Sequence, residues 1–222
     1  MISSPGLWEQ AADDPGGFCR ALARKVREAP LEQLPSVACG VDVAYAGDEA
    51  WAAAVLLDPR GHVMAQATAY RAGCAPYRPG AFFLREAPVL LEVLSLLPAK
   101  PPLLFVHGHG RAHPLGAGLA CAVGVLANIP TVGCAGEVLV GGGRQPPEAR
   151  GSWTLLAFGG ATVGALLRTR AGVKPVVVSV GHRTSLEQAV ALTLAWSTYR
   201  FPEPLRKAHQ LAIAARRAGL HG

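Results

Sequence analysis

A single aspartate interrupts one of the most apolar segments of the chain. Residues 37–47 read VACGVDVAYAG, the pattern of a buried strand, with Asp42 at its centre. Removing an unpaired carboxylate from water costs several kcal/mol, so Asp42 is expected to have a cation, a metal ion or a dense set of hydrogen bonds as its partner. A structural aspartate bonded to backbone amides fits the pattern equally well.

The other carboxylates narrow the choice of a partner acid. All five aspartates lie within the first 58 residues, and six glutamates remain from Glu86 onward. An oxygen-rich metal site must draw on these groups, and Glu86, at the start of an expected helix, is the best placed. The alternative is an ordinary acid at a helix N-terminus, where it complements the helix dipole.

Two glycine- and proline-containing segments have the composition of ligand-binding loops. Residues 76–80, PYRPG, combine a rigid turn with the ring of Tyr77, which could act as a wedge between stacked bases. Residues 106–114, VHGHGRAHP, run from an expected strand into a helix, with glycines that let the backbone approach an anion. The second segment has neither a Walker lysine nor the histidine spacing of common zinc sites. The first can equally be a plain proline-rich turn.

One histidine near the end of the chain falls on an apolar helical stripe. His209 follows Leu205 by four residues and precedes Ala212 by three, so it is expected to face inward. Most such histidines are satisfied core residues. A metal-linked role is expected only if Asp42 lies across from it.

The elements that must position these residues alternate in a way typical of an α/β protein. Three strands at 37–45, 50–57 and 62–70 have short connections and should form antiparallel hairpins. Later strands are expected at 103–106, 129–134, 153–158, 162–168 and 175–180, and helices at 16–29, 86–97, 184–196 and 204–217, with a further helix after the histidine loop and a capping box of Thr184 and Glu187. The sequence therefore predicts a single α/β domain, a mixed sheet flanked by helices.

Composition bounds the class of protein. Half of the 222 residues are apolar, yet no apolar run approaches the ~20 residues of a membrane span. The N-terminal segment has no signal-like apolar core and the five cysteines show no paired spacing, so we expect a reduced, cytoplasmic protein. The formal net charge is +6, with −4 in residues 1–50 and +10 in the remainder. Nucleic acid is thus a natural partner, although simple solubility explains the charge equally well.

Six short motifs, in order and at matching spacing, resemble the endonuclease V family, the deoxyinosine-directed nucleases. The motifs are GVDVAY, PYRPGAFFLREAP, GHGRAHP, ANIPTVGCA, SVGHR and YRFPEPLRKAH, and they span residues 20–215. The resemblance implies a ribonuclease H-like fold, a role in DNA repair, inosine-containing DNA as partner and Mg²⁺ as cofactor. It also implies hydrolysis of the second phosphodiester 3′ to deoxyinosine.

The resemblance assigns roles to individual residues. Asp42, Glu86, His107 and His209 match catalytic positions, and Asp42, His107 and Glu86 match the metal-binding ones. Residues matching the substrate-binding positions are the wedge residues Tyr77, Pro79 and Gly80 and the pocket residues Phe82, Gly108 and His113. In-line attack by a metal-activated water requires carboxylates that hold divalent ions next to the phosphate.

Two positions depart from the family pattern. His107 stands where the family has an aspartate, and Gly136 stands where it has a lysine. A neutral imidazole should weaken Mg²⁺ binding and favour Mn²⁺, Fe²⁺ or Zn²⁺. The missing lysine removes a positive charge that could steady the phosphate.

Three readings of function remain open. The first is a nuclease with impaired Mg²⁺ activity, and the second is a family member that binds inosine-containing or branched nucleic acid without cutting it. A metabolic α/β enzyme with an incidental basic charge is the third and most remote.

Overall fold

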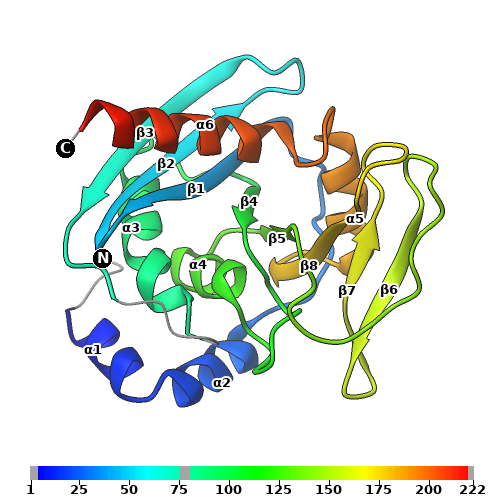
Figure 1. The fold of residues 1–222 in the computed structure, drawn as a ribbon, viewed down its shortest axis with the longest axis horizontal. Helices are drawn as coiled ribbons and strands as arrows, with labels where there is room; N and C mark the ends of the chain where they lie inside the picture. The colour runs from blue at the N-terminus through cyan, green and yellow to red at the C-terminus, as the bar shows by residue number, and fades with distance from the viewer. Residues whose placement is uncertain (1–4, 76–80, 220–222) are drawn as a thin grey trace.

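One mixed sheet runs through the whole molecule. The computed structural model describes residues 5–75 and 81–219, and its sheet has the strand order β3-β2-β1-β4-β5-β8-β7-β6 (Figure 1). The strands are β1 (Ala38–Ala46), β2 (Glu49–Leu57), β3 (Val63–Arg71), β4 (Leu104–His107), β5 (Thr131–Ala135), β6 (Trp153–Phe158), β7 (Ala161–Leu167) and β8 (Val176–His182). Strands β1, β4 and β5 are parallel, and every other pairing is antiparallel. The expected mixed sheet and the expected antiparallel hairpins of the first three strands are confirmed.

Helices cover both faces of the sheet. The helices are α1 (Pro5–Asp13), α2 (Pro15–Lys25), α3 (Phe83–Ser95), α4 (Leu119–Ala127), α5 (Leu186–Ala195) and α6 (Glu203–Ala218). Helices α3 and α4 pack on one face, in a core that contains Val41 and Val106, with α1 and α2 outside them. Helices α5 and α6 pack on the other face, in cores that contain Phe105 and Ala53. The central strands are therefore buried on both sides, which explains their nearly continuous apolar sequence.

The outer strand β6 is covered by the glycine-rich segment that follows β5. Gly142 and Ala157 exchange backbone hydrogen bonds of 2.9 and 3.0 Å, so this segment lies along the edge of β6. A Cβ at Gly141 would lie 2.2 Å from the Ala157 carbonyl oxygen, closer than any side chain can approach. Glycine is therefore required at position 141. The segment shields the open edge of β6, which could otherwise pair with a strand of another chain.

Three expectations about helices need correction. Helix α1 was not expected at all, since its sequence lacks a clear amphipathic pattern. Helix α3 begins at Phe83, three residues before the expected start, and Pro88 lies inside the helix. The cap of α5 is Ser185, whose hydroxyl accepts from Gln188 N at 3.2 Å, and not Thr184. The Thr184 side chain is buried and donates to the carbonyl oxygen of Thr131 instead.

No helix in residues 5–75 and 81–219 combines the length and the apolar character needed to cross a membrane.

Candidate metal and substrate site

The register of two parallel strands places the aspartate next to the histidine loop. Val41 of β1 pairs with Val106 of β4, so the next residues, Asp42 and His107, also lie side by side. Both side chains point to the face covered by α6, because alternate residues of a strand share a face. His107 Nδ1 lies 3.2 Å from Asp42 Oδ1. The structure thus brings together two residues that are 65 positions apart, as the sequence analysis expected.

The third member of the site arrives on α6, which lies unusually close to β1. A Cβ at Gly40 would lie 2.2 Å from the backbone of Pro204, so only glycine admits this approach. Farther along the same strand face, the small side chains of Ala44 and Ala53 pack against Ala212 of α6. This close packing brings His209 onto Asp42, with 2.5 Å between Nδ1 and Oδ2.

His209 is therefore placed differently from the sequence prediction. Its neighbours Leu205 and Ala208 are buried, but the His209 side chain is 54% exposed and lies at the wall of a cavity rather than in the core. Asp42 itself is only 7% exposed, and its buried carboxylate has two imidazole partners. These partners offset the cost of removing the carboxylate from water.

The three residues have the donor set of a divalent-metal site. Asp42, His107 and His209 each offer one ligand atom, and these atoms all lie within 4.8 Å of one another. Two ligand atoms bonded to one ion at about 2.1 Å can be no more than about 4.2 Å apart. The observed separations are at most slightly larger, so small side-chain movements would let all three residues bind one ion. Two nitrogens and one oxygen suit Mn²⁺, Fe²⁺ or Zn²⁺ better than Mg²⁺, which prefers oxygen ligands. The expected metal set of Asp42, His107 and Glu86 differs from this group in one member.

Glu86 lies on the opposite wall of the same cavity. It is in the first turn of α3 and is 6% exposed. Burial, together with the negative charge of Asp42, raises its pKa to about 8, and the nearby Tyr45 hydroxyl and Arg85 guanidinium oppose this shift. Glu86 thus lies at a helix N-terminus and close enough to Asp42 to feel its charge, so both interpretations of this residue stay open.

The cavity around these residues has a volume of about 620 Å³, within the usual range for small-ligand sites. Phe82, Gly108 and His113, which were expected to form a base pocket, all line it. His113 is 6% exposed, and its Nδ1 accepts from Leu115 N. The wedge residues Tyr77, Pro79 and Gly80 lie outside the described residues.

Several residues of the site were not singled out from the sequence. The Phe201 ring packs against the His107 ring, with 5.2 Å between centroids and 61° between planes. The Arg85 guanidinium lies over the Tyr45 ring at 4.1 Å, and Arg85 Nη2 donates to the Gly47 carbonyl oxygen. An aromatic or basic side chain next to an apolar strand is too common in sequences to reveal such contacts.

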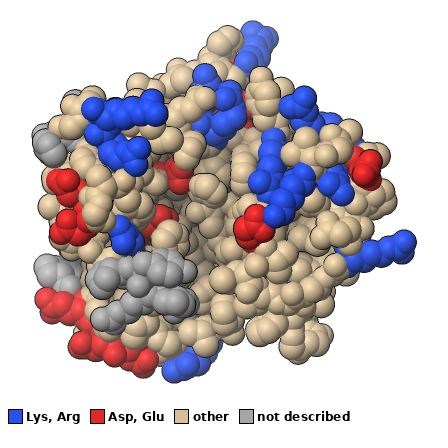
Figure 2. All heavy atoms as spheres, in the orientation of Figure 1, with Lys and Arg blue, Asp and Glu red and all other residues tan. Residues whose placement is uncertain are grey.

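The surface around the centre of the molecule is hollowed and has basic side chains on part of its rim. Figure 2 shows lysine and arginine gathered above and to the right of a central hollow, and acidic side chains at its edge, to its left and at the lower left. The basic part of the rim is consistent with the local charge excess of residues 51–222. A polyanion approaching above and to the right of the hollow would meet mostly positive charge.

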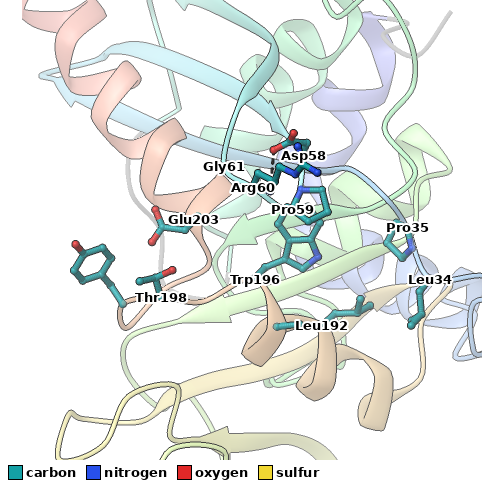
Figure 3. Close-up of a pocket in the computed structure, with 12 residues that line it drawn as sticks. Leu34, Pro35, Asp58, Pro59, Arg60, Gly61, Leu192, Trp196, Thr198 and Glu203 are labelled. Atoms are coloured by element: carbon teal, nitrogen blue, oxygen red, sulfur yellow. Dashed lines mark hydrogen bonds between the residues drawn. The ribbon is translucent and has the colours of Figure 1, made fainter.

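A second cavity of about 490 Å³ lies between the β2–β3 turn and the α5–α6 connection (Figure 3). Trp196 and Pro59 form apolar walls, and the two acids at its rim, Asp58 and Glu203, have partners within the protein, although Glu203 Oε1 is buried without a hydrogen bond. Asp58 accepts from the backbone of Arg60 and His62, and Glu203 pairs with Arg206. None of its lining residues belongs to the Asp42 cavity.

Comparisons with known proteins agree with this architecture. A family model described as Endonuclease V matches residues 20–210. An endonuclease V from Roseiflexus castenholzii is 49% identical over 179 residues, which are 80% of this chain and 81% of the relative. The crystal structure of an endonuclease V from Streptomyces avermitilis superposes with a TM-score of 0.86 at 41% identity, covering 91% of this chain and 93% of that chain.

The fold extends to more distant structures. An endonuclease V from Ciona intestinalis, solved with a 24-mer DNA containing an inosine followed by a ribo-adenosine, has a TM-score of 0.81 at 21% identity and covers 95% of this chain and 99% of that chain. The expected ribonuclease H-like α/β fold is confirmed by these likenesses.

Proposed function

The chain belongs to the endonuclease V family of nucleases, and on that premise we propose that it is a divalent-metal-dependent endonuclease of DNA repair that acts on inosine-containing DNA. Its expected reaction is hydrolysis of the second phosphodiester 3′ to deoxyinosine. The observation that carries the proposal is the convergence of Asp42, His107 and His209 at one cavity, beside Glu86. The basic side chains above and to the right of the hollow support nucleic acid as the partner.

The metal ligands proposed for this chain are Asp42, His107 and His209. When bound, a divalent ion there would activate water and stabilise the developing charge on the phosphate oxygens. The two imidazoles must be neutral to bind the ion, so acidic conditions should weaken the site. This donor set supports a preference for Mn²⁺ or another transition ion over Mg²⁺.

Glu86 is proposed as the acid–base group of the same cavity. With its pKa raised to about 8, it is mostly protonated at neutral pH in the metal-free protein. A metal ion bound at Asp42 would favour the ionised form of Glu86 by Coulomb attraction. The ionised form is the one that can accept a proton from water. Glu86 is therefore expected to act as a base only when a metal ion is bound at the Asp42 wall.

Phe82, Gly108 and His113 are proposed to receive the extruded base. Phe82 offers an aromatic face, Gly108 leaves room for close approach, and His113 offers a polar ring. Tyr77, Pro79 and Gly80 are proposed as the wedge that replaces the base in the stack. The roles of Phe82, Gly108 and His113 rest on the motif resemblance together with the cavity lining, and those of Tyr77, Pro79 and Gly80 rest on the resemblance alone.

The test is a nicking assay on an inosine-containing duplex and a matched guanosine duplex, with Mg²⁺ and with Mn²⁺. We expect inosine-dependent nicking with Mn²⁺ and much weaker nicking with Mg²⁺. Robust turnover with Mg²⁺ would contradict the proposed metal preference. Equal cutting of both duplexes would contradict the proposed substrate.

A binding protein without nuclease activity is the second candidate, and His107 at an expected aspartate position favours it. The two candidates are separated by His107→Asp, alone and together with Gly136→Lys. If the wild type binds the inosine duplex without nicking it under either metal and the variants nick it, the binding function is correct.

A further inference from the structure

An arginine side chain fills the space beside the cavity wall at Gly136. Gly136 follows β5 and lines the cavity of the metal group. A Cβ built at this position would lie 3.6 Å from Arg200 Nη2 and 3.7 Å from Arg200 Nη1. The space into which a side chain at position 136 would project is therefore occupied by the guanidinium of Arg200.

Arg200 is held in place by backbone groups rather than by acidic side chains. Its Nη2 donates to the carbonyl oxygens of Gly136 at 2.7 Å and Pro175 at 3.1 Å, and its Nε donates to that of Lys174 at 3.1 Å. These bonds use three of the five N–H donors of a guanidinium. Nη1 has no hydrogen-bond partner within residues 5–75 and 81–219, so both of its N–H groups are available to a ligand.

The fixed guanidinium is connected to the metal group through one aromatic ring. Arg200 lies 5.2 Å from the centroid of the Phe201 ring, and that ring packs against His107. The other basic side chain near this wall is already neutralised, because Lys174 Nζ binds both carboxylate oxygens of Glu137 at 2.5 and 2.6 Å. Arg200 forms no salt bridge within residues 5–75 and 81–219, although its charge helps to lower the pKa of Glu137. Its free Nη1 donors therefore lie near His107, on the other side of the Phe201 ring.

A second arginine shows what a purely structural guanidinium looks like in this protein. Arg168 also binds three backbone carbonyl oxygens, those of Pro146, Pro147 and Val173, but it uses Nη2, Nε and Nη1 to do so. Each of its nitrogens is engaged. Arg200 differs because its Nη1 is free and because it contacts Gly136, a residue that lines the cavity.

From this geometry we propose that Arg200 is a substrate-binding residue, whose Nη1 contacts a backbone phosphate of the nucleic acid beside Asp42 and His107. The inference rests on the proposed function and adds to it a residue that holds the phosphodiester at the Gly136 wall. A guanidinium suits this role because it binds phosphate oxygens with charge-assisted hydrogen bonds, and its fixed position lowers the entropy cost of binding.

The first experiment measures binding of an inosine-containing duplex by Arg200→Gln as a function of salt, with EDTA and again with Mn²⁺. Loss of one phosphate contact should lower the slope of log K against log[salt] by about 1 and weaken binding about tenfold at low salt. Arg168→Gln is the matched control and should leave the slope unchanged. Thermal melts of both variants check that the chain remains folded.

A second experiment separates a direct contact from a structural effect. Duplexes are prepared with a single uncharged methylphosphonate at successive positions around the inosine. If Arg200 contacts a phosphate, one position weakens binding by the wild type but not by Arg200→Gln, while Arg200→Lys keeps part of the sensitivity. Arg168→Gln should show the wild-type pattern at every position.

The outcomes distinguish this inference from the function on which it rests. If every methylphosphonate weakens the wild type and Arg200→Gln by equal factors and the salt slopes agree, Arg200 is structural and the inference is wrong, although the chain still binds nucleic acid. If the wild type binds no duplex with EDTA or with Mn²⁺, both the proposed function and the inference fail.

Discussion

The two walls of the central cavity present carboxyl groups of similar burial in very different surroundings. On the α6 wall, Asp42 is 7% exposed and lies against two imidazoles. On the α3 wall, Glu86 is 6% exposed and has burial as the main influence on its pKa, which rises to about 8. One wall holds an acid with two histidine neighbours, and the other holds an acid whose raised pKa keeps it mostly protonated at neutral pH. Environments that differ in this way give two carboxyl groups two separate roles.

The largest expected effect tests which wall holds the metal. Asp42→Asn should weaken binding of Mn²⁺ and Zn²⁺ by about 100-fold or more, because it removes the anionic ligand of the three-residue group. Glu86→Gln should weaken it by less than about tenfold, since it acts only through charge across the cavity. Isothermal titration calorimetry measures both. Equal losses would place Glu86 among the ligands, as the sequence analysis expected.

The next prediction concerns the close approach of α6 that creates the first wall. Gly40→Ala should destabilise the protein by about 1–3 kcal/mol in urea denaturation, because its Cβ would lie 2.2 Å from the Pro204 backbone. It should also weaken Mn²⁺ binding, because α6 carries His209. Gly136→Ala is the matched control, with no atom closer than 3.6 Å to the new Cβ, and should change neither measurement. An unchanged stability for Gly40→Ala would show that α6 can move without cost.

The second wall has a pH signature in the metal-free protein. An ordinary glutamate loses its proton near pH 4.5, whereas Glu86 keeps it up to about pH 8. Between these values the folded chain binds more protons than the unfolded chain, so stability falls as the pH rises. Glu86→Gln cannot ionise, and its melting temperature in EDTA should exceed that of the wild type by roughly 10 °C at pH 8.

The difference should disappear as the pH is lowered to about 4.5. Glu92→Gln, an exposed position on the same helix, provides the control and should follow the wild type throughout. A constant difference at all pH values would mean that Glu86→Gln acts through packing rather than through ionisation.

The smallest effect is expected at the mouth of the cavity. Glu137 and Lys174 form an ion pair with side chains that are 77% and 57% exposed. Water screens such a pair, so Lys174→Ala should leave the melting temperature unchanged within error. A clear loss of stability would mean that the exposed pair matters as much as the buried contacts of the walls, which would remove the contrast drawn between them.

The sequence was sufficient for the elements of the first wall but not for those of the second. A nearly continuous apolar run identified β1, and the carboxylate that interrupts this run identified Asp42. The start of α3 was placed three residues late, because no side chain caps this helix and Phe82, its N-cap, carries no capping signal. The burial of Glu86 depends on contacts among β1 and α3, which no local pattern records.

His209 shows the same limit from another direction. Its position on a helical stripe predicted an inward orientation, and the helix is present, yet the side chain is half-exposed at a cavity. Hydrophobic periodicity predicts the direction in which a side chain points from its own helix. Whether the side chain then meets the core or a cavity depends on the element that packs opposite it. Here the partner face is β1, where glycine and alanine bring α6 unusually close.

Local residue types alone determined the strands, the hairpins, the positive net charge and the family resemblance. Hydrophobic periodicity, turn residues and motif order are properties of the sequence and need no tertiary structure. Only the tertiary structure decided that His209 joins Asp42 and His107, that Glu86 faces them in a low-dielectric wall, and that Arg200 occupies the space beside Gly136. Each of these depends on distances between segments far apart in sequence, and such distances are set by strand register and helix packing.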